Sequence, residues 1–243
     1  MPTVFASAYE CPFAQRTWTA LLEKGVEFEM KNVELRRSED GQYQPDTKPN
    51  WLWAMNPLGK VPALQVNGEC VYESIVCNEF VEEAFPGPKM APQDAMERAK
   101  MRLIVARFES RVVPKFYKLL LTPEQCESCI KDILCELKWL ESMLVAGQTY
   151  FMGSVFSMVE LALLPFFARF NVLSHYRGFS IPENGEYDKL LHWYNAASRQ
   201  PLFQRTCREV EAHYQKPWEK CMVDIYARYA DGTALSTSAK EFK

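Results

Sequence analysis

The sequence predicts an α+β fold in which a small βαβ–ββα domain precedes an all-helical domain. Strand-like and helix-like segments alternate through the first third of the 243 residues, whereas only helical periodicity remains after a proline-rich joint. A hydrophobic content of 48% is enough to bury the core of one large domain or two modest ones. We place the first domain at residues 1–86, a linker at 87–92 and the helical domain at 93–243.

The first domain carries strand and helix signals in a fixed order. They are a strand at 4–6, a helix at 12–24, a strand at 28–33, a β-hairpin at 61–72 preceded by a loop or short helix, and a helix at 74–84. Gly25 marks the end of the first helix, because glycine readily takes the left-handed conformation found there. Asn67-Gly68 suits the tight two-residue turn of a hairpin.

Proline separates the two domains. Pro86-Gly87-Pro88 and Pro92 cannot continue a helix, and each restricts the residue before it. Helical patterns then lie at 101–108, 122–144, from 157 onward, at 187–198, at 202–214 and from 218 to just before 231. Thr122 is expected to cap the second of these helices, and Ser157 with Glu160 forms a capping box. The small polar tail at 232–243 is predicted to be disordered.

Charge and composition exclude several classes of function. The formal net charge is only -3 and no long basic block occurs, so a nucleic-acid partner is not expected. No apolar run approaches the roughly 18 residues that span a bilayer, and the N-terminus lacks the pattern of a secretory signal. Eight cysteines are too sparse for a disulfide-stapled scaffold. We therefore expect a cytoplasmic protein with free thiols and no membrane span.

Cys11 is the most informative residue of the chain. It lies between the first predicted strand and Pro12, which opens the first predicted helix. Backbone N–H groups there lack intrahelical partners, and the helix dipole favours negative charge. This position therefore favours the thiolate and should lower the thiol pKa. We predict that Cys11 is a nucleophile; a buried, inert cysteine is the alternative.

A second thiol is missing where a dithiol oxidoreductase would carry one. The residue three positions after Cys11 is Ala14. A mixed disulfide on Cys11 must therefore be released by an external thiol. Such single-thiol exchange requires a binding site for a small thiol cofactor beside Cys11.

Other residues of the first domain could form this site. Val61-Pro62 enters a strand, where a cis proline would leave the Val61 backbone free to pair with a peptide-like ligand. Ser74 opens a helix and could hold a carboxylate. Glu73 could face an ammonium group, and Lys48 offers a cation for a second carboxylate. Glutathione, which has one ammonium, two carboxylates, two amides and a thiol, matches this set.

Four motifs resemble those of the glutathione transferases, and specifically of the omega class. They are Cys11-Pro12-Phe13-Ala14-Gln15-Arg16, Lys48-Pro49-Asn50-Trp51, Asn56-Pro57-Leu58-Gly59-Lys60-Val61-Pro62 and Tyr72-Glu73-Ser74. The resemblance covers nearly the whole chain, and it implies a thioredoxin fold followed by an all-helical domain. The chain departs from the family at Glu160, where the family usually has Asp.

The resemblance also implies roles for individual residues. Cys11 would be catalytic and would form a mixed disulfide with glutathione. Phe13 and Lys48 would lie against that ligand, Val61 would give backbone hydrogen bonds, and Glu73 and Ser74 would bind the γ-glutamyl end. Trp218, which opens the last helix, is similar in placement to a tryptophan that lines the family's second pocket.

The implied activity is that of a glutathione-dependent thiol transferase and dehydroascorbate reductase, with weak conjugation of electrophiles. Glutathione would be its co-substrate, mixed disulfides its substrates, and a homodimer its assembly. Two alternatives remain: a conjugating transferase that uses Tyr9 or Ser7, or a non-enzymatic glutathione-transferase-like binding module.

Cys126-Glu127-Ser128-Cys129, with Cys135 further on, could be a redox or metal pair. No histidine lies nearby to complete a zinc set, and Cys126 falls on an apolar stripe with Ile130 and Ile133. Helix packing is therefore favoured, and no metal site is predicted. Five aromatic residues of the helical domain could line a pocket for the second substrate, but aromatic residues at helical spacing usually belong to the core, and we expect most of them there. They are Phe116, Tyr117, Phe166, Phe167 and Phe170.

Overall fold

The computed structural model of the protein describes residues 2–34 and 48–232. The chain divides into two compact units, one made of Met1–Met90 with Pro201–Gln215 and the other of Ala91–Gln200 with Lys216–Lys243. The tail predicted to be disordered lies, from residue 233 onward, outside the described residues.

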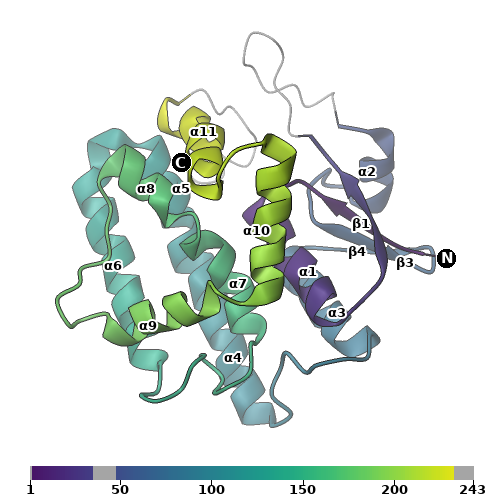
Figure 1. The fold of residues 1–243 in the computed structure, drawn as a ribbon, viewed down its shortest axis with the longest axis horizontal. Coiled ribbons are helices and arrows are strands. Elements are labelled where there is room, and N and C mark those ends of the chain that lie inside the picture. The colour runs from purple at the N-terminus through teal and green to yellow at the C-terminus, as the bar shows by residue number, and fades with distance from the viewer. Residues whose placement is uncertain (1, 35–47, 233–243) are drawn as a thin grey trace. The chain divides into compact units, whose positions relative to one another are not determined.

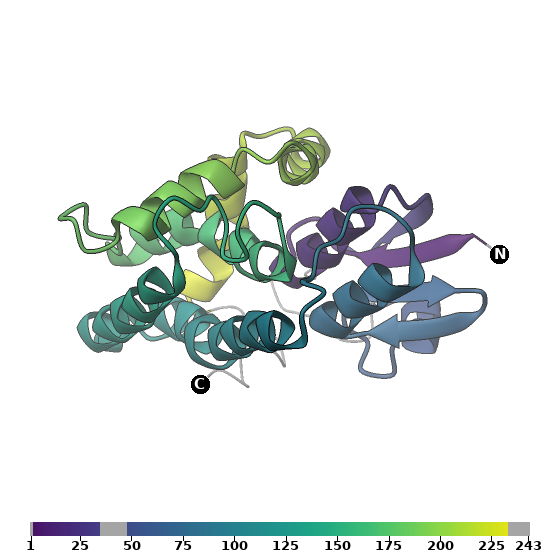
Figure 2. The same cartoon turned by 90° about the horizontal axis from the view of Figure 1, so that it is seen from below.

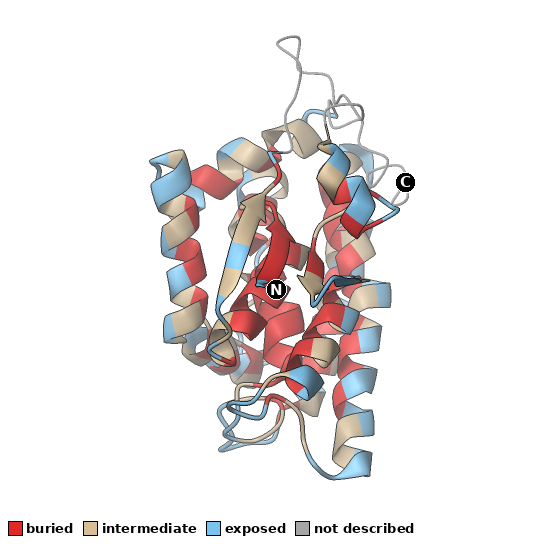
Figure 3. Ribbon diagram, turned by 90° about the vertical axis from the view of Figure 1, so that its right-hand side faces the viewer, coloured by how far each residue is buried: buried red, intermediate tan, exposed pale blue. Residues whose placement is uncertain are grey.

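The first unit contains a four-stranded sheet in the order β2-β1-β3-β4 (Figure 1). The strands are β1 (Thr3–Ser7), β2 (Phe28–Asn32), β3 (Ala63–Val66) and β4 (Glu69–Tyr72). β1 pairs with β2 in parallel and with β3 antiparallel, and β3 with β4 forms the predicted hairpin. β1 is buried along its whole length, whereas the edge strands β2 and β4 are partly exposed (Figure 3).

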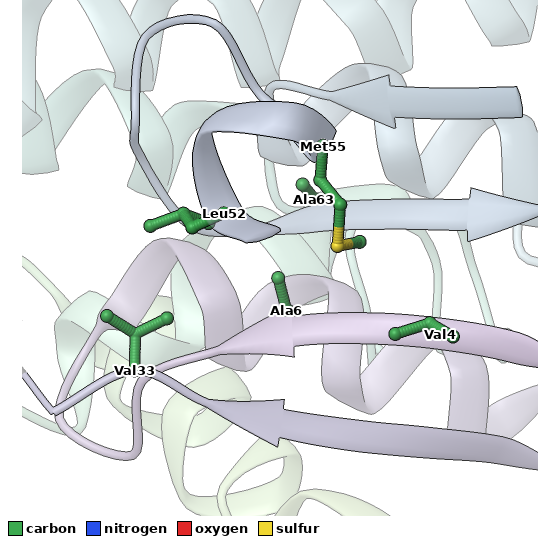
Figure 4. Close-up of a cluster of buried hydrophobic side chains, with 6 residues drawn as sticks. All are labelled: Val4, Ala6, Val33, Leu52, Met55 and Ala63. Atoms are coloured by element: carbon green, nitrogen blue, oxygen red, sulfur yellow. The ribbon is translucent and has the colours of Figure 1, made fainter. Parts of the chain in front are cut away.

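Three helices complete this thioredoxin-like arrangement. Helices α1 (Pro12–Glu23) and α3 (Ser74–Ala84) pack on each other, and α2 (Asn50–Met55) packs against β3 and β4. Figure 4 shows the cluster beneath α2, in which Leu52 and Met55 meet Val4, Ala6 and Ala63 of the sheet, with Val33 beside them. Removing a side chain such as Leu52 from water contributes roughly 1.5–3 kcal/mol. This core fixes the strand ends from which the candidate site is built.

Helix α10 (Pro201–Tyr214) also belongs to the first unit, where it packs on α1 (Figure 1). The amide of Gln15 on α1 donates to Thr206 Oγ1 at 2.9 Å and to Cys207 Sγ at 3.6 Å. All three residues are buried. A segment about 190 residues further along the chain thus packs against α1, the helix that Cys11 caps.

Helices make up the second unit, as the sequence predicts (Figure 2). They are α4 (Ala95–Arg107), a π-helical turn (Phe108–Val112), α5 (Val113–Leu121), a 3-10 turn (Pro123–Gln125), α6 (Cys126–Met143), α7 (Met158–Phe167), α8 (Phe170–Arg177), α9 (Asp188–Ala197) and α11 (Trp218–Ala230). The five aromatic residues expected in its core are buried, with Phe116 and Phe166 fully so. Among the described residues, no helix combines the length and apolar character needed to cross a bilayer.

The capping box predicted at the start of α7 is present. The Glu160 carboxylate accepts from the Ser157 backbone N–H at 2.8 Å and from its hydroxyl at 2.6 Å. Its other oxygen accepts from the Phe151 N–H at 2.9 Å and from the Trp193 ring N–H at 3.0 Å. Burial raises the pKa of Glu160, although these hydrogen bonds lower it in part. The Glu160 side chain, which is longer than that of Asp, accepts four hydrogen bonds from donors in three segments of the chain.

Two details of the second unit differ from expectation. Thr122 does not cap the following helix, because its hydroxyl donates back to the Lys118 carbonyl at 2.7 Å and closes the end of α5. The buried stripe of α6 passes through Cys129, which is 2% exposed, whereas Cys126 is only half-buried. Cys135 is exposed, and all eight cysteines are free.

Candidate active site

The candidate site lies at one edge of the sheet, where the strand register brings three chain segments together. Ala6 pairs with Ala63, and Ala63 pairs with Tyr72. Both pairings are antiparallel, so the end of β1, the start of β3 and the end of β4 lie level with one another. Cys11 follows β1, Val61 precedes β3, and Glu73-Ser74 follows β4. Segments that are distant in sequence therefore meet beside Cys11.

Cys11 occupies the N-cap of α1, as predicted. Its Sγ accepts a hydrogen bond from the Ala14 N–H at 3.5 Å, and the thiol is partly exposed. The Cys11 N–H donates to the Ala8 carbonyl at 3.0 Å and closes a turn, and Pro12 begins the helix. A sulfur in this place faces the backbone N–H groups that have no intrahelical acceptor, and these favour a negative charge.

Ser74 opens α3 and is tied to α1 by two polar residues. Arg16 is fully buried, and its guanidinium donates to Ser74 Oγ at 3.2 Å. Thr17 Oγ1 lies 3.4 Å from the Ser74 carbonyl oxygen and donates to Asn78 Oδ1 at 2.9 Å. The N-terminus of α3 thus combines a hydroxyl, unpaired backbone N–H groups and a buried positive charge, which together suit a carboxylate.

Glu73 precedes Ser74 in a conformation that few non-glycine residues adopt. Its φ is 71° and its ψ is 119°, and its carbonyl accepts the first hydrogen bond of α3 from the Cys77 N–H at 2.8 Å. The side chain is exposed and makes no capping hydrogen bond. Such backbone strain costs about 1–3 kcal/mol and persists mainly at functional sites. The Glu73 carboxylate is therefore held out toward solvent beside the start of α3.

Val61 lies just outside the β3 ladder, whose pairs begin at Ala63, and packs against the cluster under α2. The Val61–Pro62 peptide bond is cis. Upstream, the Asn56 side chain donates to the Lys60 carbonyl at 2.8 Å and accepts from the Leu58 N–H at 2.9 Å. These bonds hold in place the loop that leads to Val61.

Gly59 lies in the same loop under the ring of Trp53. Its φ is +58°, and a Cβ there would come within 2.6 Å of Trp53 ring carbons. Only glycine fits this approach without displacing the ring. Lys48 Nζ lies 5.6 Å from the centre of the same ring, which places a cation at this end of α2.

Phe13 and Trp218 occupy different units of the structure. Phe13 is half-buried in the first turn of α1, with the Arg16 guanidinium carbon 5.0 Å from its ring centre. Trp218 begins α11 in the second unit, where its ring N–H donates to the Ala168 carbonyl at 3.0 Å and Arg169 lies over the ring at 4.9 Å.

The two rival hydroxyls are poorly suited to stabilising a thiolate. Ser7 is fully buried within β1. Tyr9 stacks on His213 with ring centres 4.3 Å apart. Burial and the charge of Glu209 raise the pKa of Tyr9, which makes its hydroxyl a weaker hydrogen-bond donor.

Sequence reasoning overlooked Arg16 and the end of α10 as parts of this site. One signal was available for Arg16, since it and Glu23 are the charged residues of α1, and a charged residue on the buried side of a helix must have a polar partner. No local signal pointed to α10. Among the described residues, no group of three or more His, Cys, Asp and Glu side chains is arranged to hold a metal ion.

Comparison with known proteins agrees with this geometry. Residues 10–84 match the model of the glutathione S-transferase N-terminal domain, and residues 131–196 match that of the C-terminal domain. Glutathione S-transferase U19 of Arabidopsis thaliana is 34% identical over 184 residues, which span 74% of this chain and 78% of that protein. The chain belongs to the glutathione S-transferase family.

Within this family, omega-class members are prominent among the similar proteins. Glutathione S-transferase omega-1 of Sus scrofa is 32% identical over 167 residues, 67% of this chain. The chain spans 65% of the length of that relative. The crystal structure of glutathione transferase Omega 3C from Trametes versicolor matches with a TM-score of 0.78 and 29% identity, covering 97% of this chain and 93% of that one. This glutathione S-transferase therefore has the fold of an omega-class structure nearly throughout.

Proposed function

We propose that this protein is a glutathione-dependent thiol transferase that reduces glutathione mixed disulfides, and also dehydroascorbate, through Cys11. The observation that carries the proposal is the Cys11 sulfur at the N-cap of α1, where it accepts from the Ala14 N–H at 3.5 Å. A thiolate is favoured there. Thiolates attack disulfide sulfur, whereas a tyrosine or serine hydroxyl only stabilises a bound thiolate.

The lack of a resolving thiol supports a single-cysteine mechanism. Ala14 stands where a second active-site cysteine would lie. Cys77, on the first turn of α3, is fully buried, and burial with the charge of Glu73 raises its pKa to about 12. It stays protonated at neutral pH and is a poor attacking thiol. An external thiol must therefore complete the cycle.

Glutathione would bind along the sheet edge through the residues described above. The Ser74 hydroxyl, the α3 N-terminus and the Arg16 charge would hold the γ-glutamyl carboxylate, and Glu73 its ammonium group. The Val61 backbone would pair with the tripeptide in strand fashion. Lys48 would face the glycyl carboxylate, and Phe13 would lie against the ligand. The bound tripeptide would then hold its sulfur close to Cys11.

The proposed reaction has two balanced exchange steps. The Cys11 thiolate attacks the glutathionyl sulfur of a mixed disulfide; a new S–S bond forms, the old one breaks, and the substrate thiolate leaves and takes up a proton. A glutathione thiolate then attacks the glutathionyl sulfur on Cys11, which releases oxidised glutathione and regenerates the Cys11 thiolate. Across both steps, the sulfur of the one added glutathione is oxidised to the disulfide level as the substrate sulfur is reduced to a thiol. Dehydroascorbate would instead take two electrons and two protons from two glutathione molecules, which leave as one oxidised glutathione.

Steady-state kinetics test this proposal. Reduction of a glutathione mixed disulfide should follow ping-pong kinetics, and Cys11→Ser should abolish it. Cys135→Ser is the matched control, because that cysteine is exposed but lies on α6 in the second unit. Its activity should equal that of the unmodified protein. Full activity of Cys11→Ser would refute the proposal, and glutathione binding with no turnover by the unmodified protein would identify a binding module instead.

We also propose that the protein is a cytoplasmic homodimer. Eight free cysteines suit a reducing compartment. On α4, Met96 and Leu103 are each 65% exposed and lie two helical turns apart on one face. We assign this face of α4 to the interface between the two copies, which would cover both side chains. Light scattering of the protein and of a Met96→Glu, Leu103→Glu variant tests this assembly. A monomer mass for the unmodified protein would contradict the dimer, and a dimer mass for the variant would remove this face from its interface.

A further inference from the structure

The last turn of α10 contacts both residues that immediately precede Cys11. The His213 ring stacks on Tyr9, with centres 4.3 Å apart and planes 24° apart. The Tyr214 hydroxyl donates to Glu10 Oε2 at 2.9 Å. Adjacent residues of one helix thus hold adjacent residues of the loop that leads to Cys11.

This loop is a tight turn that positions the sulfur. The Cys11 N–H donates to the Ala8 carbonyl at 3.0 Å, so Tyr9 and Glu10 are the two central residues of a β-turn. On the other side of Cys11, Gln15 is bonded to Thr206 and Cys207 of α10. Helix α10 therefore holds the chain on both sides of Cys11.

Glu10 is an unfavourable neighbour for a thiolate. Glu10 directly precedes Cys11 in the chain and is only 9% exposed, so water screens its charge poorly. A nearby negative charge opposes ionisation of a thiol. A donor that binds the carboxylate fixes its position and spreads its charge, and Tyr214 is such a donor. The other titratable groups that the structure places against this turn are His213 and Glu209 of α10, of which the first stacks on Tyr9 and the second acts on it through its charge.

We propose that Tyr214 is a positioning residue for Cys11, because its hydroxyl holds the Glu10 carboxylate where it interferes least with the thiolate. Through this hydrogen bond, a helix more than 200 residues along the chain sets the reactivity of the nucleophile. This inference rests on the proposed role of Cys11 and adds a residue to it.

The test is the pH dependence of Cys11 alkylation by iodoacetamide, followed by mass spectrometry in the full chain. Tyr214→Phe removes only the hydroxyl and should slow alkylation near pH 6 by about three- to tenfold, as the thiol pKa rises by about half a unit to one unit. Glu10→Gln should speed alkylation at that pH. In the Glu10→Gln background, Tyr214→Phe should have almost no effect, because the charge that it controls is gone.

Tyr176→Phe is the matched control, since it removes a hydrogen bond of the same length, 2.9 Å, from Tyr176 to the Val223 carbonyl in the second unit. It should leave the alkylation profile unchanged. A Tyr214→Phe profile equal to that of the unmodified protein, or an undiminished effect in the Glu10→Gln background, would overturn the proposal. Should Tyr214→Phe fail to fold, Glu10→Gln alone decides, and an unchanged rate would count against the proposal.

These outcomes separate this inference from the proposed function. If Cys11 of the unmodified protein resists alkylation at neutral pH, the proposed function fails. If Cys11 reacts but is indifferent to Tyr214 and Glu10, only the positioning role fails.

Discussion

Replacing Glu73 with glycine should make the protein more stable and its glutathione site worse. Glu73 has a φ of 71° and a ψ of 119°, and the positive φ costs glycine less than a residue with a Cβ. The strain removed is about 1–3 kcal/mol, and the greater freedom of glycine in the unfolded chain offsets about 0.5–1 kcal/mol of it. The Glu73 side chain is exposed and makes no capping hydrogen bond to α3, so its removal should change the free energy of unfolding little. The free energy of unfolding should therefore rise by about 1 kcal/mol.

The same substitution should weaken glutathione binding. If the Glu73 carboxylate holds the ammonium group of glutathione, its loss should raise KM for glutathione about tenfold, which corresponds to about 1.4 kcal/mol. kcat should change little, because this contact is the same before and during sulfur exchange.

Glu73→Ala is the matched control, since alanine also lacks the carboxylate but retains the strain. Urea unfolding and steady-state kinetics on both variants separate the two effects. Both should show the higher KM, and only Glu73→Gly should gain stability. A Glu73→Gly variant no more stable than Glu73→Ala would refute the strain argument, and an unchanged KM in both would remove Glu73 from the binding site.

Two further predictions concern stability. Ser157→Ala removes the hydroxyl that caps α7 and donates to buried Glu160. Urea titration should show a free energy of unfolding lower by about 2–3 kcal/mol. The control is Ser128→Ala, on the exposed side of α6, which should lower it by less than about 0.5 kcal/mol. Burial raises the pKa of Glu23 from 4.5 to about 7, so the folded state binds the extra proton and loses stability as pH rises across that interval. As the pH rises from 4.5 to 7, the free energy of unfolding of Glu23→Gln should therefore increase by up to about 1 kcal/mol relative to that of the unmodified protein. This figure is smaller than the full pKa shift would give, because the carboxyl is partly solvated.

Each of these has a clear contrary result. A Ser157→Ala loss no larger than that of Ser128→Ala would show that the capping box contributes little. A stability difference between Glu23→Gln and the unmodified protein that is constant with pH would show that Glu23 titrates normally.

Local signals explain why most of the fold could be predicted from the sequence. The Asn67-Gly68 turn, the Cys11-Pro12 helix start and the Ser157–Glu160 capping box depend on neighbouring residues, and all three are present. Helix α5 and the π-helical turn before it were not predicted. Pro114 lacks an N–H, and the Val113 N–H bonds instead to the Phe108 carbonyl, five residues back, which gives the π-helical turn.

The parts of the site that the sequence did not predict depend on tertiary contacts. Arg16 belongs to a recognisable motif, but its bond to Ser74 exists only because α1 packs on α3. The bond from Tyr214 to Glu10 joins residues 204 positions apart. Neither leaves a trace in periodicity or spacing, and α10 looks like any other amphipathic helix of the second half of the sequence.

The central claim is that Cys11 alone carries the glutathionyl group. Intact mass after incubation with oxidised glutathione, followed by peptide mapping, measures this directly. A single adduct located on Cys11, absent in Cys11→Ser and removed by reduced glutathione, is the predicted result. An adduct located on another cysteine, or none at all while the folded protein still binds glutathione, would contradict the account.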